Sequence, residues 1–458
     1  MADFQKTVEL IGVLAHPYND SWDPDDYPVA GAMGCFAEES SADIHRRHKI
    51  NGEPYVTGRG DKRRELSWEE TKELIMRETS GRGHRAVLDL SAFVFSVDNL
   101  SRASTLFLCG PEYASHLQQS LRRATAKRGC VEVHFDPDSE MGKREFEETD
   151  SRMGNELMER QFELYTEMAK AGVSKEDARI ILPLNTKTAI TSMWNASELT
   201  HLKSMVDRMK IPAEVRDTVY QMYQEASLAA PKTMADREKN QEVLSWFPSS
   251  QLFAETNPTL ERIAMRGKGV ELMDFSKGLT MTPEEIRQAV EERDEALLSN
   301  LKHYHFSFGA GMSLMTEHQA IRQRTWNHTS EPLDSAVRRG VHITPKSVSK
   351  AGFDGEYSGL VRESLRYASS HSRDPEAQGV IPHALQVYSA IHINGWNAIH
   401  SIGKRTCKTA QWEIRGIARD MARKIEERVP ELGKYSRPQG VLYGTCPERE
   451  DCGACGKR

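Results

Sequence analysis

The sequence predicts an α+β fold in which helix exceeds strand, built from two tandem copies of one domain. Helix-start signals of the capping-box type recur along the chain. Two apolar segments rich in aromatic and β-branched residues predict buried strands. Several features of the first half also recur in the second half, in the same order and at nearly constant spacing.

The clearest helix signals are a Ser or Thr followed three residues later by Glu, because these side chains satisfy the free N–H groups of a first turn. The segment SWEE opens a helix predicted over 67–78. The segment TPEE, with proline in the first turn, opens a helix predicted over 282–301. Amphipathic patterns predict two further helices, over 152–171 and 411–428.

The strand signals also reveal the duplication. Strands are predicted over 92–97 and 304–308, and each contains a Phe-x-Phe pair. Further along each half, a proline and an asparagine recur at one common offset: Pro183 and Asn195, then Pro382 and Asn394. Residues 226–258 lack steady periodicity and are rich in turn formers, so the boundary is placed near residue 245. The first copy is thus predicted over 1–245 and the second over 246–458.

Composition excludes several functional classes. The 458 residues carry 61 Lys and Arg against 67 Asp and Glu, a mild balance that argues against a nucleic-acid partner. No segment approaches the roughly 20 apolar residues of a membrane helix, and the N-terminus does not read as a secretory signal. A cytoplasmic protein without a membrane partner is expected.

Cysteine usage fits the same compartment. The seven cysteines are odd in number and sparse, so a disulfide framework is not expected. Three of them, in the tail 446–455, lack the histidine or fourth cysteine that structural zinc needs. No metal site is therefore predicted.

Four blocks of sequence resemble one known family. They are residues 83–123 and 172–199 in the first half, and 317–332 and 394–415 in the second. The specific parts are the Phe-x-Phe strand leading into Gln-Gln-Ser-x-Arg, and the ending Ala-Gln-Trp-Glu-Ile-Arg. Together these blocks resemble the flavin-dependent thymidylate synthase family.

The resemblance implies a mixed sheet with helices, and tetramers whose sites lie between subunits. It implies conversion of dUMP to dTMP, with methylenetetrahydrofolate as carbon donor, FAD as hydride source and NADPH as reductant. A flavin carries the redox step in such an enzyme, while the protein supplies position and electrostatics. The arginines of the family's site suit this chemistry, because a guanidinium binds phosphate oxygens through two parallel charge-assisted bonds.

The first copy departs from the family's pattern at the flavin side. Residues 110–112 (GPE) stand where the family has Arg-His-Arg, and Val206 replaces a nucleotide-binding arginine. The nucleotide-side residues are kept in Ser120-x-Arg122 and in Arg179.

The second copy shows nearly the opposite pattern. Arg322-Gln323-Arg324 keeps both signature arginines, but Trp396 replaces an arginine of the ending. Three of its nucleotide-side positions have also changed, to Pro332, Asp334 and Gln378.

The losses are complementary, so one nearly complete site can be assembled from both copies. The resemblance assigns Ser120 and Arg405 to catalysis, Gln119, Arg122, Arg179, Gln319 and Glu331 to substrate binding, and Arg322, Arg324, Asn394, His400, His84 and Asn195 to cofactor binding. A homodimer that imitates the tetramer is expected, with one class of site active and the mirrored class degenerate.

Two alternatives stay open. In the first, the chain is a decayed homologue that binds nucleotide or flavin without turnover. In the second, it is an active enzyme that alkylates C5 of a different pyrimidine nucleotide. Outside the resemblance, residues 411–414 read simply as a helix start, with Trp412 and Ile414 in the core and Glu413 capping.

Overall fold

The computed structural model describes residues 5–16, 21–122, 125–126, 128–135, 147–235, 252–267, 269–323, 325–447 and 453. The chain forms two compact units. The first unit combines 1–120 with 186–248, and the second combines 121–185 with 249–458. A segment of the first sequence half therefore packs with the second half. The predicted boundary near residue 245 lies outside the described residues.

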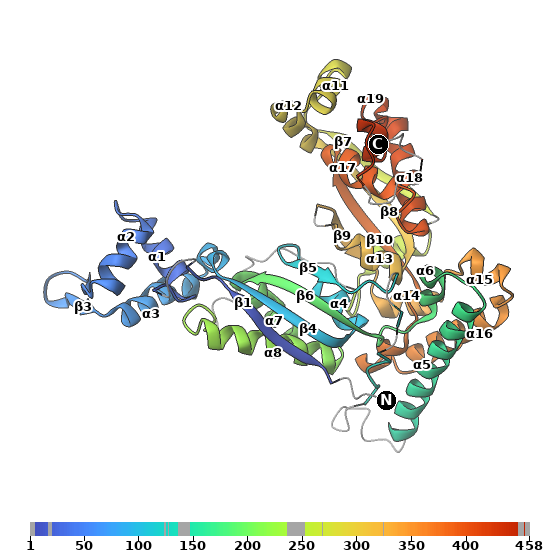
Figure 1. Cartoon of the computed structure of the whole chain (residues 1–458), viewed down its shortest axis with the longest axis horizontal. Coiled ribbons are helices and arrows are strands. Elements are labelled where there is room, and N and C mark those ends of the chain that lie inside the picture. The colour runs from blue at the N-terminus through green and yellow to red at the C-terminus, as the bar shows by residue number, and fades with distance from the viewer. Residues whose placement is uncertain are drawn as a thin grey trace. The chain divides into compact units, whose positions relative to one another are not determined.

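The first unit is built around a four-stranded antiparallel sheet with strand order β1-β4-β6-β5. Phe93 and Phe95 of β4 are fully buried beneath α7 and α8, which cover one face of the sheet (Figure 1). The elements of this unit are β1 (Thr7–Val13), α1 (Asp26–Gly34), α2 (Ser41–His45), β2 (Tyr55–Thr57), β3 (Arg64–Leu66), α3 (Trp68–Glu78), β4 (Ala92–Ser101), α4 (Arg102–Leu108), β5 (Ser115–Gln118), β6 (Lys187–Asn195), α7 (Ala196–Arg208) and α8 (Ala213–Ala229).

The second unit repeats this design with strand order β7-β8-β10-β9. Phe306 and Phe308 of β8 pair with Ile393 and Ile391 of β10 and are buried with α17 and α18 in one core. The elements from its own sequence half are α10 (Pro258–Ala264), β7 (Val270–Lys277), α11 (Pro283–Glu291), α12 (Glu295–Asn300), β8 (Tyr304–Ser313), α13 (Leu314–Ala320), β9 (Asn327–Ser330), α14 (Leu333–Arg339), α15 (Lys346–Lys350), α16 (Asp354–Ser370), η7 (Pro375–Val380), β10 (Gln386–Asn394), α17 (Gly395–Thr406), α18 (Trp412–Arg428), α19 (Pro430–Gly433) and α20 (Gln439–Tyr443).

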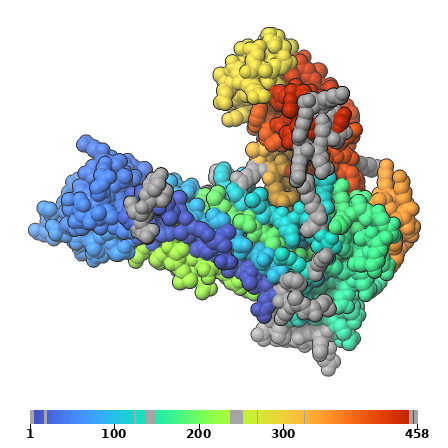
Figure 2. All heavy atoms as spheres, viewed as in Figure 1, coloured from blue at the N-terminus to red at the C-terminus, as the bar shows by residue number. Residues whose placement is uncertain are grey.

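The segment contributed by the first half supplies α5 (Glu147–Lys170), α6 (Lys175–Ala178) and the 3₁₀ turn η5 (Arg179–Ile181). Helix α5 packs on α16, where the buried Gln161 amide donates to the Ser364 hydroxyl and the Val380 carbonyl. Pro183 and Pro382, which are repeat-related, form an isolated antiparallel bridge. Equivalent stretches of the two copies thus lie side by side in this unit, in green and orange in Figure 2.

Most sequence-predicted elements are confirmed, and one is wrong in extent. Both capping boxes form, at the starts of α3 and α11. The helix predicted over 282–301 is two helices, because Arg293 adopts a left-handed φ of 59° between α11 and α12. The prediction missed this break because the capping and apolar pattern carry no signal for a positive φ at an arginine. None of the helices in the described part is long and apolar enough to cross a membrane.

Candidate functional site

In the second unit, four arginines from the two sequence halves are linked in series by electrostatic interactions. Arg122 and Arg179 come from the first half, while Arg322 and Arg405 come from the second. Arg122 and Arg322 both lower the pKa of Arg179, and Arg322 lowers the pKa of Arg405. We call these four side chains the arginine cluster.

Arg179 is the most deeply buried member of the cluster. It begins η5, directly after α6, and only 5% of it is exposed. Burial, together with the cations of Arg122 and Arg322, lowers its pKa to about 10 against the opposing effect of Glu176, so it stays protonated at neutral pH. Its Nε donates to the Glu176 carbonyl at 3.2 Å.

Arg122 connects the first-half segment to the end of the second copy. Its Nε forms an ion pair with the Glu176 carboxylate. Its Nη1 donates to the carbonyl of Thr409 at 2.7 Å, in the turn between α17 and α18. The same junction is fastened by Trp412, whose Nε1 donates to Asp177 at 2.8 Å. Trp412 is therefore a bridge between the two sequence halves, and the prediction that it lies in the core is wrong.

Arg322 lies two residues beyond the end of α13, and its Nε donates to the His318 carbonyl at 2.9 Å. The start of α13 is clamped by Glu413, which accepts from the Ser313 N–H at 2.7 Å and from the hydroxyls of Ser313 and Thr316. The sequence suggested that Glu413 caps its own helix, α18, and this prediction is wrong. Gln411 caps this helix instead, accepting from two N–H groups of α18.

Arg405 lies in the last turn of α17, and its pKa is lowered first by burial and then by Arg322. Two carboxylates, Glu176 and Asp177, raise the pKa of Arg179 and so oppose the effect of burial there, and Glu176 also forms an ion pair with Arg122. The partly buried guanidinium groups repel one another, and a bound anion would relieve this repulsion. A phosphate dianion matches the planar donor forks of several arginines.

Helix α17 also carries the predicted asparagine and histidine. The Asn394 side chain caps the helix and accepts from the Asn397 N–H at 3.0 Å. The His400 ring stacks on Trp396 with centroids 5.4 Å apart. Burial and, to a lesser extent, Lys404 lower the pKa of His400, so its imidazole is neutral at neutral pH. Asn195 plays the same capping part for α7 in the first unit.

The remaining predicted residues do not belong to the arginine cluster. Gln319, half-buried, donates to the Met315 carbonyl within α13. Glu331 is buried in a separate cluster, where it accepts from Arg339, Ser335 and the Tyr388 N–H. Gln119 and Ser120 are the last two residues of segment 1–120 of the first unit. His84 lies in the same segment, is exposed and precedes a 3₁₀ turn. Arg324 lies outside the described residues.

The second copy does not reproduce the cationic pair Arg122 and Arg179. Its corresponding residues are Asp334 and Gln378, and the Gln378 amide donates to the Asp334 carboxylate at 3.4 Å. Burial raises the pKa of Asp334. A carboxyl and an amide cannot attract a phosphate as two guanidinium groups do, so this mirrored position is unsuited to one.

The sequence reading missed Glu176, Asp177 and Thr409. A signal existed for Glu176, since it stands three residues before Arg179 and shares a helical face with it. The Thr409 carbonyl carried none, because a backbone acceptor has no sequence signature. No group of three or more potential metal ligands occurs within the described residues. Cys446 is buried, while Cys452 and Cys455 lie outside the described part.

Comparison with known proteins adds independent findings. The family model "Thymidylate synthase complementing protein" matches twice, over residues 21–232 and 270–431, which confirms the predicted duplication. The chain is 32% identical to the flavin-dependent thymidylate synthase of Pyrococcus furiosus over 36% of this chain and 64% of that protein. It is 29% identical to the enzyme of the same name from Geobacter sulfurreducens, over 33% of this chain and 68% of that protein.

The chain thus spans about 64% of the length of the first of these curated relatives. Among solved structures, it is similar to the UMP/dUMP methylase PolB from Streptomyces cacaoi bound with 5-Br dUMP. That likeness has 17% identity and a TM-score of 0.37, and covers 50% of this chain and 94% of the other.

Proposed function

We propose a function from the premise that this chain belongs to the thymidylate synthase complementing protein family. The chain is a flavin-dependent enzyme that methylates C5 of a pyrimidine nucleotide, converting dUMP to dTMP with methylenetetrahydrofolate and NADPH. The observation that supports the proposal is the arginine cluster, because it joins guanidinium groups of both copies within one unit.

The nucleotide phosphate binds in the arginine cluster. Arg179 and Arg122 supply the donors from the first-half segment, and Arg405 approaches from α17. An arginine beside the pyrimidine ring also stabilises the negative charge that develops as C5 becomes nucleophilic, and we assign this role to Arg405. Family resemblance alone assigns the Ser120 hydroxyl to the orientation of the ring and Gln319 to a further substrate contact.

The residues around Arg322 and α17 suit a flavin. Apart from its Nε, the exposed Arg322 guanidinium donates to no protein atom in the described part of the chain, which leaves donors for a pyrophosphate. The stacked rings of Trp396 and His400 offer an aromatic surface, and Asn394 stands at the start of the same helix. When bound, FAD supplies the hydride that completes the methyl group. His84, Asn195 and Arg324 are assigned to the flavin by family resemblance alone.

Each chain has one working nucleotide site. Asp334 and Gln378 replace the cationic pair at the mirrored position, so that position does not bind a phosphate. We further propose that two chains associate as a homodimer that imitates the tetramer of the single-copy enzymes.

The test uses purified full-length chain in three steps. Bound FAD gives an absorbance band near about 450 nm. The chain then oxidises NADPH only when both dUMP and methylenetetrahydrofolate are present, and dTMP appears as product. Turnover with UMP in place of dUMP supports the changed-substrate alternative. A yellow protein that binds dUMP without turnover supports the degenerate homologue, and a colourless protein that binds no nucleotide contradicts both.

A further inference from the structure

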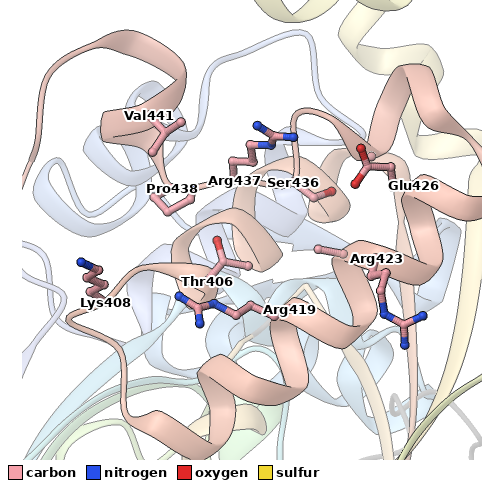
Figure 3. A pocket seen from close by; sticks show the side chains of 11 residues that line it. Thr406, Lys408, Arg419, Arg423, Glu426, Ser436, Arg437, Pro438 and Val441 are labelled. Carbon is pink, nitrogen blue, oxygen red and sulfur yellow. The ribbon is translucent and has the colours of Figure 1, made fainter. Parts of the chain in front are cut away.

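A cationic pocket lies in the second unit and is distinct from the arginine cluster. It has a volume of about 360 Å³ and none of the four clustered arginines lines it. The end of α17, the turn after it, α18 and residues 433–441 form its walls (Figure 3). Its polar lining includes Thr406, Lys408, Arg419, Arg423, Ser436 and Arg437.

The charges of this pocket are mostly unpaired. Lys408, Arg419 and Arg437 form no ion pair with a carboxylate within the described residues. Arg423 is already satisfied, because it donates to Glu427 at 2.6 Å, and in Figure 3 its guanidinium points away from Arg419. Glu426 is the single carboxylate among the lining residues of the pocket. The pocket therefore has a positive excess that a bound anion would neutralise.

A buried hydroxyl supplies a second, independent observation. Ser436 lines the pocket and is only 3% exposed. Its Oγ has no hydrogen-bond partner in the part of the chain that the structure describes. A buried polar group without a partner is costly, so an unpartnered hydroxyl in the wall of a cationic pocket points to a ligand that completes it.

The walls of the pocket are held by close backbone contacts. A Cβ on Gly403 of α17 would lie 2.6 Å from the Arg437 carbonyl oxygen. A Cβ on Gly433 would lie 2.3 Å from the Cα of Glu426 on α18. Glycine at both positions lets residues 433–437 pack directly on the two helices, so Ser436 and Arg437 are positioned before any ligand binds.

We propose that this pocket binds the phosphoryl group of a small molecule. A phosphate dianion has several acceptor oxygens and matches guanidinium, ammonium and hydroxyl donors that line one small space. The ligand is either free inorganic phosphate or a phosphorylated metabolite. The inference does not depend on the proposed methylation, since it uses none of the residues assigned to that reaction.

The experiment is calorimetric titration of full-length chain with inorganic phosphate. The titration uses the Arg322→Gln variant, in which phosphate binding at the arginine cluster is weakened. Arg322 is an exposed side chain. Arg419→Gln is expected to weaken the remaining phosphate binding by about tenfold or more, because one charge-assisted interaction is lost. Arg428→Gln, an exposed position on the same helix outside the pocket, is the control and leaves binding unchanged.

Ser436→Ala separates a ligand contact from a structural role. We expect weaker phosphate binding with no fall in the melting temperature, because the substitution removes a buried hydroxyl that has no protein partner. Adenosine 2′,5′-bisphosphate is the second probe: tighter binding than phosphate assigns the pocket to a phosphorylated metabolite, and equal binding assigns it to the free ion. Absence of phosphate binding in the Arg322→Gln background, or equal affinity with and without Arg419→Gln, overturns the proposal.

Discussion

Under the proposed function, Arg405 favours anion binding at the expense of the stability of the ligand-free chain. It is partly buried beside Arg322, and both burial and that neighbour lower its pKa. Such a group is unfavourable in the ligand-free chain and becomes favourable only when an anion arrives. The same reasoning applies to Arg179, whose burial is deeper still.

Arg405→Gln tests this trade-off. We expect a ligand-free melting temperature equal to or above that of the unsubstituted chain, because a repelling buried cation is removed. We expect dUMP affinity to fall by about 10- to 100-fold, since a charged hydrogen bond is lost. Thermal unfolding and calorimetric titration measure the two effects. A lower melting temperature with unchanged dUMP affinity would assign Arg405 a purely structural role.

Individual residues differ in how far the sequence could place them. Arg122, Arg179, Arg322 and Arg405 were all named from the family resemblance, and the structure brings them together. Glu331 was named on the same grounds but lies in a buried cluster with Arg339. A match of residue type cannot tell which partner a carboxylate will find, because that depends on packing between distant segments.

At the scale of elements, Glu413 joins α18 to the start of α13, and Arg322 lies two residues beyond the end of that helix. Burial raises the pKa of the Glu413 carboxyl, although hydrogen bonds from Ser313 and Thr316 oppose the shift. The folded chain therefore binds this proton more tightly than the unfolded chain. Stability falls as the pH rises from the ordinary carboxyl pKa towards the raised one.

Glu413→Gln removes this titration while keeping an acceptor. The ordinary pKa of a glutamate carboxyl is 4.5. As the pH rises from this value towards neutrality, we expect the variant to gain stability relative to the unsubstituted chain, measured as the free energy of unfolding. Denaturant unfolding at several pH values measures the difference. Parallel stability curves for the two proteins would show that Glu413 does not titrate with folding. Glu413→Ala should cost about 3 kcal/mol, since it leaves buried donors unpaired.

Trp412 fastens α6, and with it Arg179, to α18. Trp412→Phe keeps an aromatic ring but loses the hydrogen bond to Asp177. We expect a small loss of stability, about 1 kcal/mol, and a larger proportional loss of dUMP affinity, because the first-half arginines are less firmly positioned. Trp326→Phe, which instead loses a buried hydrogen bond to Ser401, is the matched comparison. Equal effects of the two variants on dUMP affinity would contradict a positioning role for Trp412.

The elements themselves were largely predictable because their signals are local. Capping boxes and Phe-x-Phe strands depend on neighbouring residues, and they appear where expected. The break at Arg293 and the packing of 121–185 with the second half were not predictable. The first depends on one backbone angle, and the second on contacts such as those of Gln161, far apart in sequence.

At the scale of the whole molecule, the two copies differ at the positions that correspond to Arg122 and Arg179. One copy keeps the cationic pair, and the other has a carboxyl and an amide in its place. We therefore predict one dUMP per chain at saturation, where two equivalent copies would give two. Equilibrium dialysis with labelled dUMP counts the sites. A value of two would show that the Asp334 and Gln378 position also binds nucleotide.

The central claim, that both halves of one chain build a single nucleotide site, is tested most directly by mixing. Arg179→Gln and Arg405→Gln chains carrying different tags are co-expressed and purified together, and dUMP binding is titrated. Unsubstituted chain co-expressed with the Arg179→Gln/Arg405→Gln double variant is the control, and it binds dUMP tightly at half of its chains. We predict that the mixture of single variants binds as weakly as either variant alone. Recovery of tight binding at a fraction of its sites would contradict the claim, because it would require the two arginines to come from different chains.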